Sequence, residues 1–323
     1  MPAWCRDVEC VGPDAPIPGD RPFSADEATR AGVDASLRRR LVERGLLRPV
    51  LRGVFVVSHV PDSLRLRVAA LELVVPEHAV VVDRTAAWLH GVDALPRSAI
   101  HRMPPLDVYS QGASRLRRPG LASGTRELTV RDVERLGPLT VTTPLRTACD
   151  LGRRLWRFDA LSAIDGFLRL GLDHDLLLSE SERFKGHRGM RQLRQLAPLG
   201  DPGAESPPES ALRLHWYDAD LPQPETQIWV HDDDGRPTYR LDMGHREARY
   251  GAEYFGEEFH PGAGTEHDEE RLTWLRTRRD WAMDVFVKTD VYGSELTASD
   301  RLRVGFDRAV ARPAVTYVDL ARP

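Results

Sequence analysis

The chain of 323 residues is long enough for two or three domains, each with its own core. Hydrophobic residues make up 41% and charged residues 29% of it, as in soluble globular proteins, and no run of about 18 apolar residues predicts a membrane helix. The formal net charge of −4 argues against a uniformly basic nucleic-acid-binding protein but leaves room for a local basic patch.

Cysteine usage indicates a reduced, cytoplasmic protein. The three cysteines, Cys5, Cys10 and Cys149, are odd in number and do not form the CxxC or Cys/His spacing of a metal site. The N-terminal stretch MPAWCRDVEC lacks the apolar core of a signal peptide. We therefore expect a cytoplasmic location without membrane association, and we expect Cys149 to be a small core residue.

The first sixty residues predict a tail and a small DNA-binding fold. Residues 1–20, rich in Pro, Gly and Asp, predict a flexible tail. In residues 21–60, Ser24 precedes one short helix and Asp34 precedes a second, and each helix is followed by a glycine. The apolar runs LLRPV and LRGVFVV then predict a β-hairpin, so this part is expected to be a winged helix-turn-helix.

Basic residues concentrate in the second helix and the hairpin. Between Arg21 and Arg52 there are eight arginines and four acids, a local net charge of +4. Guanidinium groups pair bidentately with phosphates, so this patch predicts DNA binding. The alternative, a solvated amphipathic helix, stays open. The candidate DNA-binding residues are Arg38, Arg39, Arg40, Arg44, Arg48 and Arg52.

Residues 61–200 predict a mainly helical middle region with some strand. Residues 83–92, DRTAAWLHGV, indicate a packed helix, and residues 138–155 indicate a strand followed by a helix with proline at its first position. Arg146 and Asp150 are four residues apart and are expected to pair in a structural role. This region has no nucleophile, metal or phosphate-loop spacing.

A linker, PLGDPGAESPPES, precedes the C-terminal region. Residues 201–293 predict a helix, three strands, a helix and a strand. Ser206 and Glu209 predict a capping box at the start of the first helix, so Glu209 already has a structural role. Residues 294–323 form a C-terminal extension to which we assign no function.

The stretch YGAEYFGEEFH, residues 250–260, allows two interpretations: a solvated strand end or half of a metal site. If the preceding hairpin closes on a two-residue turn at Glu247 and Ala248, Asp242 lies opposite Glu253, with Cβ atoms about 4.5–5.5 Å apart. Two carboxylates so placed repel each other unless a cation lies between them, and a divalent metal would explain them. A slip of one residue would put them on opposite faces of the sheet.

Two parts of the chain resemble known families. The motifs RLDMGH, AEYFGEEFH and HDEERLTWL resemble the very-short-patch-repair (Vsr) type of endonuclease domain in the PD-(D/E)xK superfamily. The run LLRPVLRGVFVV, followed by RTAAWLHG and TTPLRTACDL, resembles the AbiEi-type antitoxin family. The implied fold is multidomain, α+β or α/β. It has a winged helix-turn-helix, a mixed, mostly helical middle and a restriction-endonuclease-like αβββαβ core.

The endonuclease resemblance implies a Mg²⁺ site that hydrolyses phosphodiester bonds. Asp242 and Glu253 would bind the metal, and Glu209 would add a ligand or orient the attacking water. His260 would act as general acid or base, or bind the phosphate. The residues expected to brace this site are Asp268 and Arg271.

One position departs from the resembled pattern. Phe255 stands where related domains have an acid and where the wider superfamily often has a lysine, and no lysine is nearby. On the assumed register Arg240 faces Phe255 and would supply the missing cation. Loss of this polar group would weaken metal binding or abolish cleavage, so a nuclease fold retained for binding alone stays open.

Three functions follow from these patterns. The first is a Mg²⁺-dependent DNA endonuclease in repair or defence, which needs Asp242 and Glu253 on one accessible face. The second is a non-catalytic transcriptional regulator or antitoxin, which needs only the arginines between residues 38 and 52. The third is an antitoxin whose acidic C-terminal surface covers a cognate toxin. DNA is the expected partner in the first two, and a toxin protein in the third.

Overall fold

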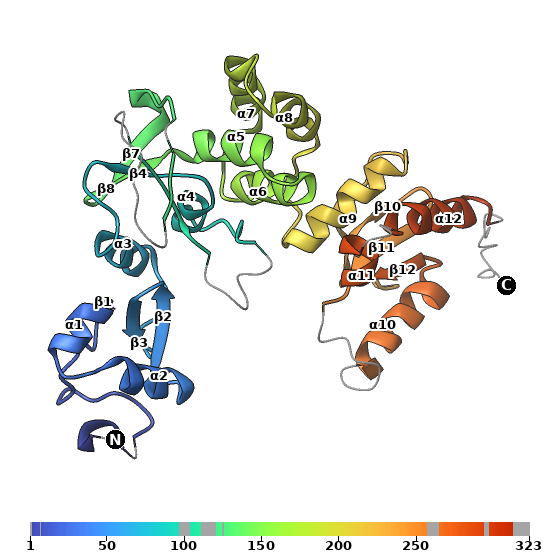
Figure 1. The fold of residues 1–323 in the computed structure, drawn as a ribbon. Coiled ribbons are helices and arrows are strands. Elements are labelled where there is room, and N and C mark those ends of the chain that lie inside the picture. Colours follow the sequence, from blue (N-terminus) through green and yellow to red (C-terminus); the bar gives the residue numbers. More distant parts are fainter. Residues whose placement is uncertain are drawn as a thin grey trace. The chain divides into compact units, whose positions relative to one another are not determined.

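The computed structural model describes residues 2–6, 8–96, 104–110, 121–124, 126–256, 265–293 and 297–312. The chain forms two compact units, one of residues 1–153 with 175–185 and one of residues 154–174 with 186–323 (Figure 1). Both contain helices and sheets, which confirms the predicted mixture of α and β structure. The predicted domain boundaries do not coincide with this division and stay predictions. Across the described ranges, no helix is long and apolar enough to cross a bilayer.

The first unit begins with two short helices and a three-stranded antiparallel sheet. Its elements are η1 (Ala3–Cys5), β1 (Phe23–Ser24), α1 (Ala25–Arg30), α2 (Ala35–Glu43), β2 (Leu47–Leu51) and β3 (Val54–Val57), with strand order β1-β3-β2. Both predicted N-caps are present, since Ser24 and Asp34 accept backbone N–H groups of their helices. Gly53 connects β2 to β3 with a φ of +78°, in the left-handed region that favours glycine.

The described residues of the segment 2–20 pack onto these elements, whereas the sequence predicted a flexible tail for residues 1–20. Cys5, Val11 and Ile17 are buried. They share one hydrophobic cluster with Phe23, Ala28, Val33, Leu37, Leu41, Leu46, Leu47 and Val57. The Nη1 atom of Arg44 also donates to the carbonyl oxygen of Cys5 over 2.6 Å. The apolar residues are too few and too widely spaced to give a periodic signal, yet their burial fixes the segment.

The rest of the first unit is built around a five-stranded sheet. Its elements are α3 (Leu64–Glu72), β4 (Ala79–Val81), α4 (Asp83–His90), β5 (Leu106–Ser110), β6 (Leu121–Ala122), η3 (Val130–Asp132), β7 (Val133–Leu136), β8 (Leu139–Thr142), α5 (Pro144–Arg154), α7 (His174–Ser181) and η4 (Glu182–Phe184). The strand order is β6-β5-β4-β8-β7, with β4 parallel to β8 and β5 parallel to β6. Leu51, Leu66, Val81, Leu89 and Val141 belong to one cluster, so the hairpin and this sheet share a core.

The second unit contains a four-stranded mixed sheet. Its elements are α6 (Arg157–Arg169), α8 (Met190–Leu196), η5 (Ala197–Leu199), α9 (Pro207–Asp218), β9 (Glu225–His231), β10 (Pro237–His245), β11 (Tyr250–Tyr254), α10 (Thr265–Arg278), β12 (Ala282–Phe286), α11 (Lys288–Tyr292) and α12 (Ala298–Val310). The strand order is β12-β11-β10-β9, in which only the β11–β12 pair is parallel. From α9 to β12, the elements follow the order predicted for residues 201–293.

Helices on this sheet complete the core of the second unit. One hydrophobic cluster joins α10 to the strands through Ile228, Val230, Leu241, Leu275, Trp281 and Met283. Elsewhere Trp216 of α9 stacks on Tyr250 of β11 with ring centroids 5.5 Å apart. Phe306 of α12 meets both rings edge-on at 6.0 Å. The extension that begins at residue 294 therefore contributes a core helix.

Candidate functional site

The six arginines predicted to bind DNA lie on α2 and the β2–β3 hairpin, where they fall into two groups. Three donate to backbone carbonyl groups: Arg38 to Val33, Arg44 to Cys5 and Arg48 to Val60. Arg38 also lies over the Phe55 ring, with its guanidinium carbon 6.0 Å from the centroid. The fold therefore holds these three side chains in place through neutral carbonyl groups, and Arg48 also interacts electrostatically with the nearby Asp62 carboxylate.

Arg39, Arg40 and Arg52 form the second group, which we name the exposed arginine group. All three are exposed, and none has an ion-pair partner within the described ranges. On α2, Leu37 and Leu41 are buried while Arg39 and Arg40 face solvent. Arg52 lies at the β2–β3 turn. An exposed guanidinium without an acidic partner is available to pair with a phosphate.

The predicted register of the β10–β11 hairpin agrees with the structure. Met243 pairs with Ala252, and the same register continued by one residue sets Asp242 opposite Glu253. The connection is longer than the predicted two residues, because residues 246–249 lie between the strands. The two acids that the sequence singled out are therefore neighbours.

Asp242 occupies an electrostatically unfavourable position. Burial raises the pKa of Asp242 to about 7, and the nearby carboxylates of Glu209 and Glu253 add to the rise. The backbone N–H of Tyr254 opposes this effect by donating to Oδ2 of Asp242 over 3.0 Å. The Asp242 carboxyl group consequently titrates near neutral pH, a property found both at active sites and at sites that lack a compensating cation.

Glu253 is neutralised by an arginine. Its two carboxylate oxygens accept from Nη1 and Nη2 of Arg271 at 2.7 and 2.5 Å, and the side chains are 3% and 16% exposed. Burial nevertheless raises the pKa of Glu253, and the charge of Asp268 contributes to the rise. The Arg271 guanidinium carbon lies 5.8 Å from the centroid of the Phe255 ring, so Arg271 supplies a positive charge beside Phe255.

Arg240 and Glu209 are engaged in other contacts. Arg240 forms a bidentate pair with Glu205 at 3.0 and 2.9 Å. The acid before α9 therefore compensates the charge of Arg240, and the expectation that Arg240 replaces the missing cation stays a prediction. Ser206 is the predicted N-cap of α9 and accepts from the Glu209 N–H. The Glu209 side chain makes bonds other than the capping-box bond to the Ser206 N–H: its Oε1 accepts from the Ser206 hydroxyl at 2.6 Å. Its Oε2 accepts from the N–H of Glu205.

The two predicted metal ligands, Asp242 and Glu253, already accept hydrogen bonds from protein groups. In the part of the chain that the structure describes, no three His, Cys, Asp or Glu side chains are placed to hold a metal ion. Arg271 occupies both oxygens of Glu253, and the Tyr254 N–H occupies Oδ2 of Asp242. His260, the predicted general acid or base, lies outside the described residues. A cation near Asp242 would compete with Arg271 for Glu253.

Sequence reasoning missed a buried ionic network in the first unit. Asp150 on α5 accepts from Arg126 at 2.7 Å, Arg146 at 2.8 Å and Arg153 at 2.6 Å. Burial raises the pKa of Asp150, but the three guanidinium groups outweigh burial and hold this pKa below its usual value. Arg126 also forms a bidentate pair with Asp83 of α4. The predicted Arg146–Asp150 pair is confirmed. The pair between Asp150 and Arg126 was not predictable from local sequence spacing, because Arg126 lies 24 residues away in the chain.

A comparison with protein families identifies one domain, whose residues belong partly to the first unit and partly to the second. Residues 78–199 match the AbiEi antitoxin C-terminal domain. The matched segment runs from the strand before α4 through the five-stranded sheet and the helices that follow it, and it contains the ionic network. The predicted antitoxin resemblance is confirmed for this segment. The resemblance of residues 201–293 to Vsr-type endonucleases stays a prediction.

A comparison with individual proteins extends this result to most of the chain. Two similar proteins come from Mycobacterium tuberculosis, strains CDC 1551 / Oshkosh and ATCC 25618 / H37Rv, and both are described as uncharacterised. The chain is 31% identical to each over 270 residues, which cover 83% of this chain and 95% of each relative. The chain belongs to the same family as these mycobacterial proteins, and it carries an AbiEi antitoxin C-terminal domain.

Proposed function

We propose that this protein is a DNA-binding regulator of the toxin–antitoxin type. The observation that carries the proposal is the AbiEi antitoxin C-terminal domain at residues 78–199. Residues 78–153 and 175–185 of that domain lie in the same compact unit as the helices and hairpin that present the exposed arginine group. The antitoxin domain implies a cognate toxin as the protein partner, and the arginines fit DNA as the second partner.

We interpret α1, α2 and the β2–β3 hairpin as a winged helix-turn-helix. In helix-turn-helix proteins the second helix lies in the major groove of DNA. Here the second helix presents Arg39 and Arg40, and the adjacent hairpin presents Arg52. Arginine contacts to phosphates fix position and supply affinity, while contacts to base edges supply specificity. The exposed arginine group therefore accounts for affinity and orientation, and this proposal does not include a particular DNA sequence.

Binding to the DNA upstream of the protein's own gene tests this proposal, because a regulator of its own expression would bind there. We expect saturable binding in fluorescence anisotropy, at least about a thousandfold tighter than to an unrelated duplex. Equal affinity for both duplexes would reject an operator at this location. Co-purification of the protein with the product of the adjacent gene tests the toxin partner separately, because that contact does not require DNA.

Metal-dependent cleavage of DNA by residues 201–293 is the second candidate function. One observation favours it: α9, three strands, α10 and β12 follow the αβββαβ order of a restriction-endonuclease-like core, with Asp242 opposite Glu253. The pair between Arg271 and Glu253 stands against it, because it occupies a proposed ligand of Mg²⁺.

Plasmid cleavage distinguishes the two candidates. Purified protein is incubated with supercoiled plasmid and Mg²⁺ or Mn²⁺, beside an Asp242→Ala/Glu253→Ala double variant. Cleavage by the wild type and not by the variant would establish a nuclease. Retarded but intact plasmid with either metal would leave a DNA-binding protein without nuclease activity.

A further inference from the structure

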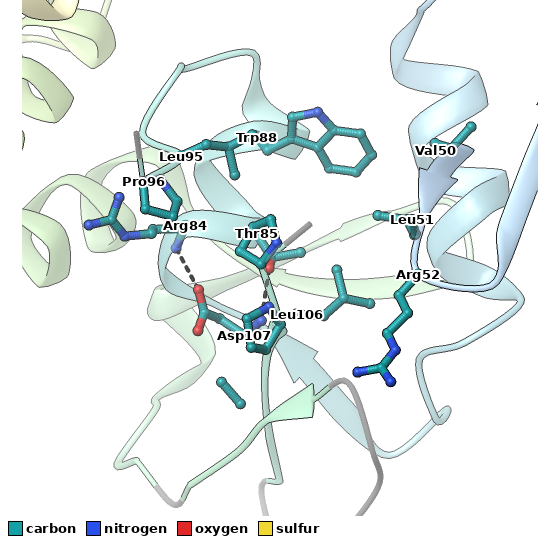
Figure 2. Close-up of a pocket in the computed structure, with 13 residues that line it drawn as sticks. Val50, Leu51, Arg52, Arg84, Thr85, Trp88, Leu95, Pro96, Leu106 and Asp107 are labelled. Atoms are coloured by element: carbon teal, nitrogen blue, oxygen red, sulfur yellow. Dashed lines mark hydrogen bonds between the residues drawn. The ribbon is translucent and has the colours of Figure 1, made fainter. Parts of the chain in front are cut away.

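The first unit contains a cavity between the hairpin and the antitoxin domain. Its volume is about 360 Å³, within the range of small-molecule sites. Figure 2 shows Trp88 of α4, Leu51 of β2 and Leu106 of β5 around the same space. Leu95 and Pro96 add further apolar surface from the segment after α4. The cavity is therefore lined mainly by apolar groups from several elements.

Two of the charged residues that line the cavity are already engaged. The carboxylate of Asp107 accepts from the backbone N–H of Arg84 over 3.1 Å, near the start of α4, and Figure 2 shows it directed toward that group. The backbone N–H of Asp107 donates to Thr85 Oγ1 over 2.8 Å. The guanidinium of Arg84 donates to the carbonyl oxygen of Ala94. These contacts give Asp107 and Arg84 structural roles in holding α4 against β5.

Arg52 is the third charged residue, and it differs from the other two. It lines the cavity next to Leu51, it is exposed, and it has no ion-pair partner among the residues that the structure describes. A guanidinium beside an apolar cavity is complementary to a molecule that has an apolar body and one anionic group. An amine-bearing ligand would instead have to draw Asp107 away from the Arg84 N–H.

We propose that this cavity binds a small organic acid, with its apolar body against Trp88, Leu51 and Leu106 and its anionic group paired with Arg52. Because Arg52 also belongs to the exposed arginine group, bound acid would remove one of the cations available to DNA phosphates. The acid would therefore lower DNA affinity. This regulatory part of the inference rests on the proposed function, whereas the binding of the acid does not.

Two dyes with the same apolar body test the site. The anionic probe is 8-anilinonaphthalene-1-sulfonate, and the neutral probe is N-phenyl-1-naphthylamine, which lacks the sulfonate. We expect the folded wild type to bind one equivalent of the anionic dye about tenfold more tightly than the neutral dye, because only the sulfonate can pair with Arg52. Fluorescence titration measures both affinities.

Three substitutions locate the binding. Arg52→Gln should abolish the preference for the anionic dye and leave the affinity for the neutral dye unchanged. Arg40→Gln, the same change at an exposed arginine that does not line the cavity, should keep the preference. Ala122→Phe should weaken the binding of both dyes, because Ala122 lines the cavity and the larger side chain occupies part of it. Equal preference in the wild type and Arg52→Gln would overturn the proposed site.

The regulatory part is tested by DNA affinity at saturating dye. The anionic dye should weaken DNA binding by the wild type several-fold and should leave the weaker binding by Arg52→Gln unchanged. Dye binding that depends on Arg52 without any change in DNA affinity would refute regulation and retain the acid site. A wild type that binds no DNA would refute the proposed function, while the dye preference would still decide the acid site.

Discussion

At Asp242, burial and neighbouring carboxylates act against ionisation, and one backbone N–H favours it. The folded state binds the Asp242 proton up to about pH 7, whereas the ordinary pKa of this group is 3.8. Between those pH values the folded state holds more protons than the unfolded chain, so the free energy of unfolding falls as pH rises from about 4 to about 7. Above pH 7 the Asp242 charge therefore destabilises the second unit.

Asp242→Asn should consequently stabilise the protein at pH 8 and have little effect at pH 4. The amide oxygen can still accept from the Tyr254 N–H, and the unfavourable charge is absent. Since one pKa unit corresponds to about 1.4 kcal/mol, we expect a gain on the order of 2–4 kcal/mol at pH 8. Urea unfolding of wild type and variant at both pH values measures it. The same difference at pH 4 and pH 8 would show that Asp242 does not titrate abnormally.

The two groups of arginines on α2 and the hairpin should respond differently to loss of charge. Arg40→Gln should weaken DNA binding and reduce the slope of log affinity against log salt by about one, because one phosphate contact is lost. Arg44→Gln removes the same charge together with the hydrogen bond to Cys5, so it should also lower the free energy of unfolding by about 1 kcal/mol. DNA titrations at several salt concentrations, paired with urea unfolding, separate the two effects. Equal stability of both variants would contradict this division.

Single residues were predictable where a local rule constrains them. The N-caps Ser24, Asp34 and Ser206 were predictable because each needs only neighbours within three residues. The partner of Arg240 was not predictable, because Glu205 lies in a segment distant in the sequence. Opposed carboxylates predict a cation in general, and the sequence could not decide between a metal and Arg271.

At the scale of elements, the N-terminal segment acts as part of the fold. Ile17 is 5% exposed within the cluster that contains Leu37 and Leu41 of α2. Ile17→Ala should destabilise this part of the first unit by about 2–5 kcal/mol, through lost burial and an unfilled cavity. Asp14→Ala, an exposed position in the same segment, serves as control and should change stability by less than about 0.5 kcal/mol. Equal thermal unfolding temperatures for Ile17→Ala and Asp14→Ala would show that the segment does not pack against α2.

Helix α5 anchors the antitoxin domain through Asp150, which is fully buried among three guanidinium groups. Asp150→Asn should cost about 3–5 kcal/mol, because it removes the negative charge that three buried guanidinium groups share. Asp218→Asn, which weakens the partly exposed pair with Arg157, should cost less than about 1 kcal/mol. Chemical unfolding of both variants at pH 7 provides the comparison. An Asp150→Asn variant as stable as wild type would contradict an anchoring role.

The lowered pKa of Asp150 adds a pH dependence to the same anchor. Because the folded pKa lies below the unfolded value, the stabilisation is complete above the unfolded pKa and is lost as pH falls toward the folded pKa. The stability difference between wild type and Asp150→Asn should therefore shrink in acid. A difference that stays constant from pH 7 to pH 3 would show that ionised Asp150 is not its source.

Element order was more predictable than element packing. The order of helix, three strands, helix and strand in the second unit follows from alternation, turn residues and helix caps, which are all local signals. The sequence assigned helix α12 no role and predicted a flexible tail for residues 1–20, because burial depends on partners distant in the sequence, such as Tyr250 for Phe306. The cavity beside Leu51 was unpredictable for the same reason, since its walls come from separate elements.

At the scale of the whole molecule, charge is distributed unevenly. The chain has a formal net charge of −4, while the segment from Arg21 to Arg52 has a local net charge of +4. In the proposed role, this basic segment would attract DNA although the protein as a whole is acidic, and salt would weaken the attraction. The composition of the chain predicted this asymmetry, and the structure identifies the arginines that are free of acidic partners within its described residues.

The salt dependence of DNA affinity tests the central claim most directly. It is measured for wild type, for the Arg39→Gln/Arg40→Gln/Arg52→Gln variant and for a control with the same charge loss in the second unit, Arg236→Gln/Arg303→Gln/Arg308→Gln. We expect the first variant to lower the slope of log affinity against log salt by about two to three, and we expect the control to retain the wild-type slope. Equal slopes for all three proteins, or a loss shared by the control, would contradict DNA binding through the exposed arginine group.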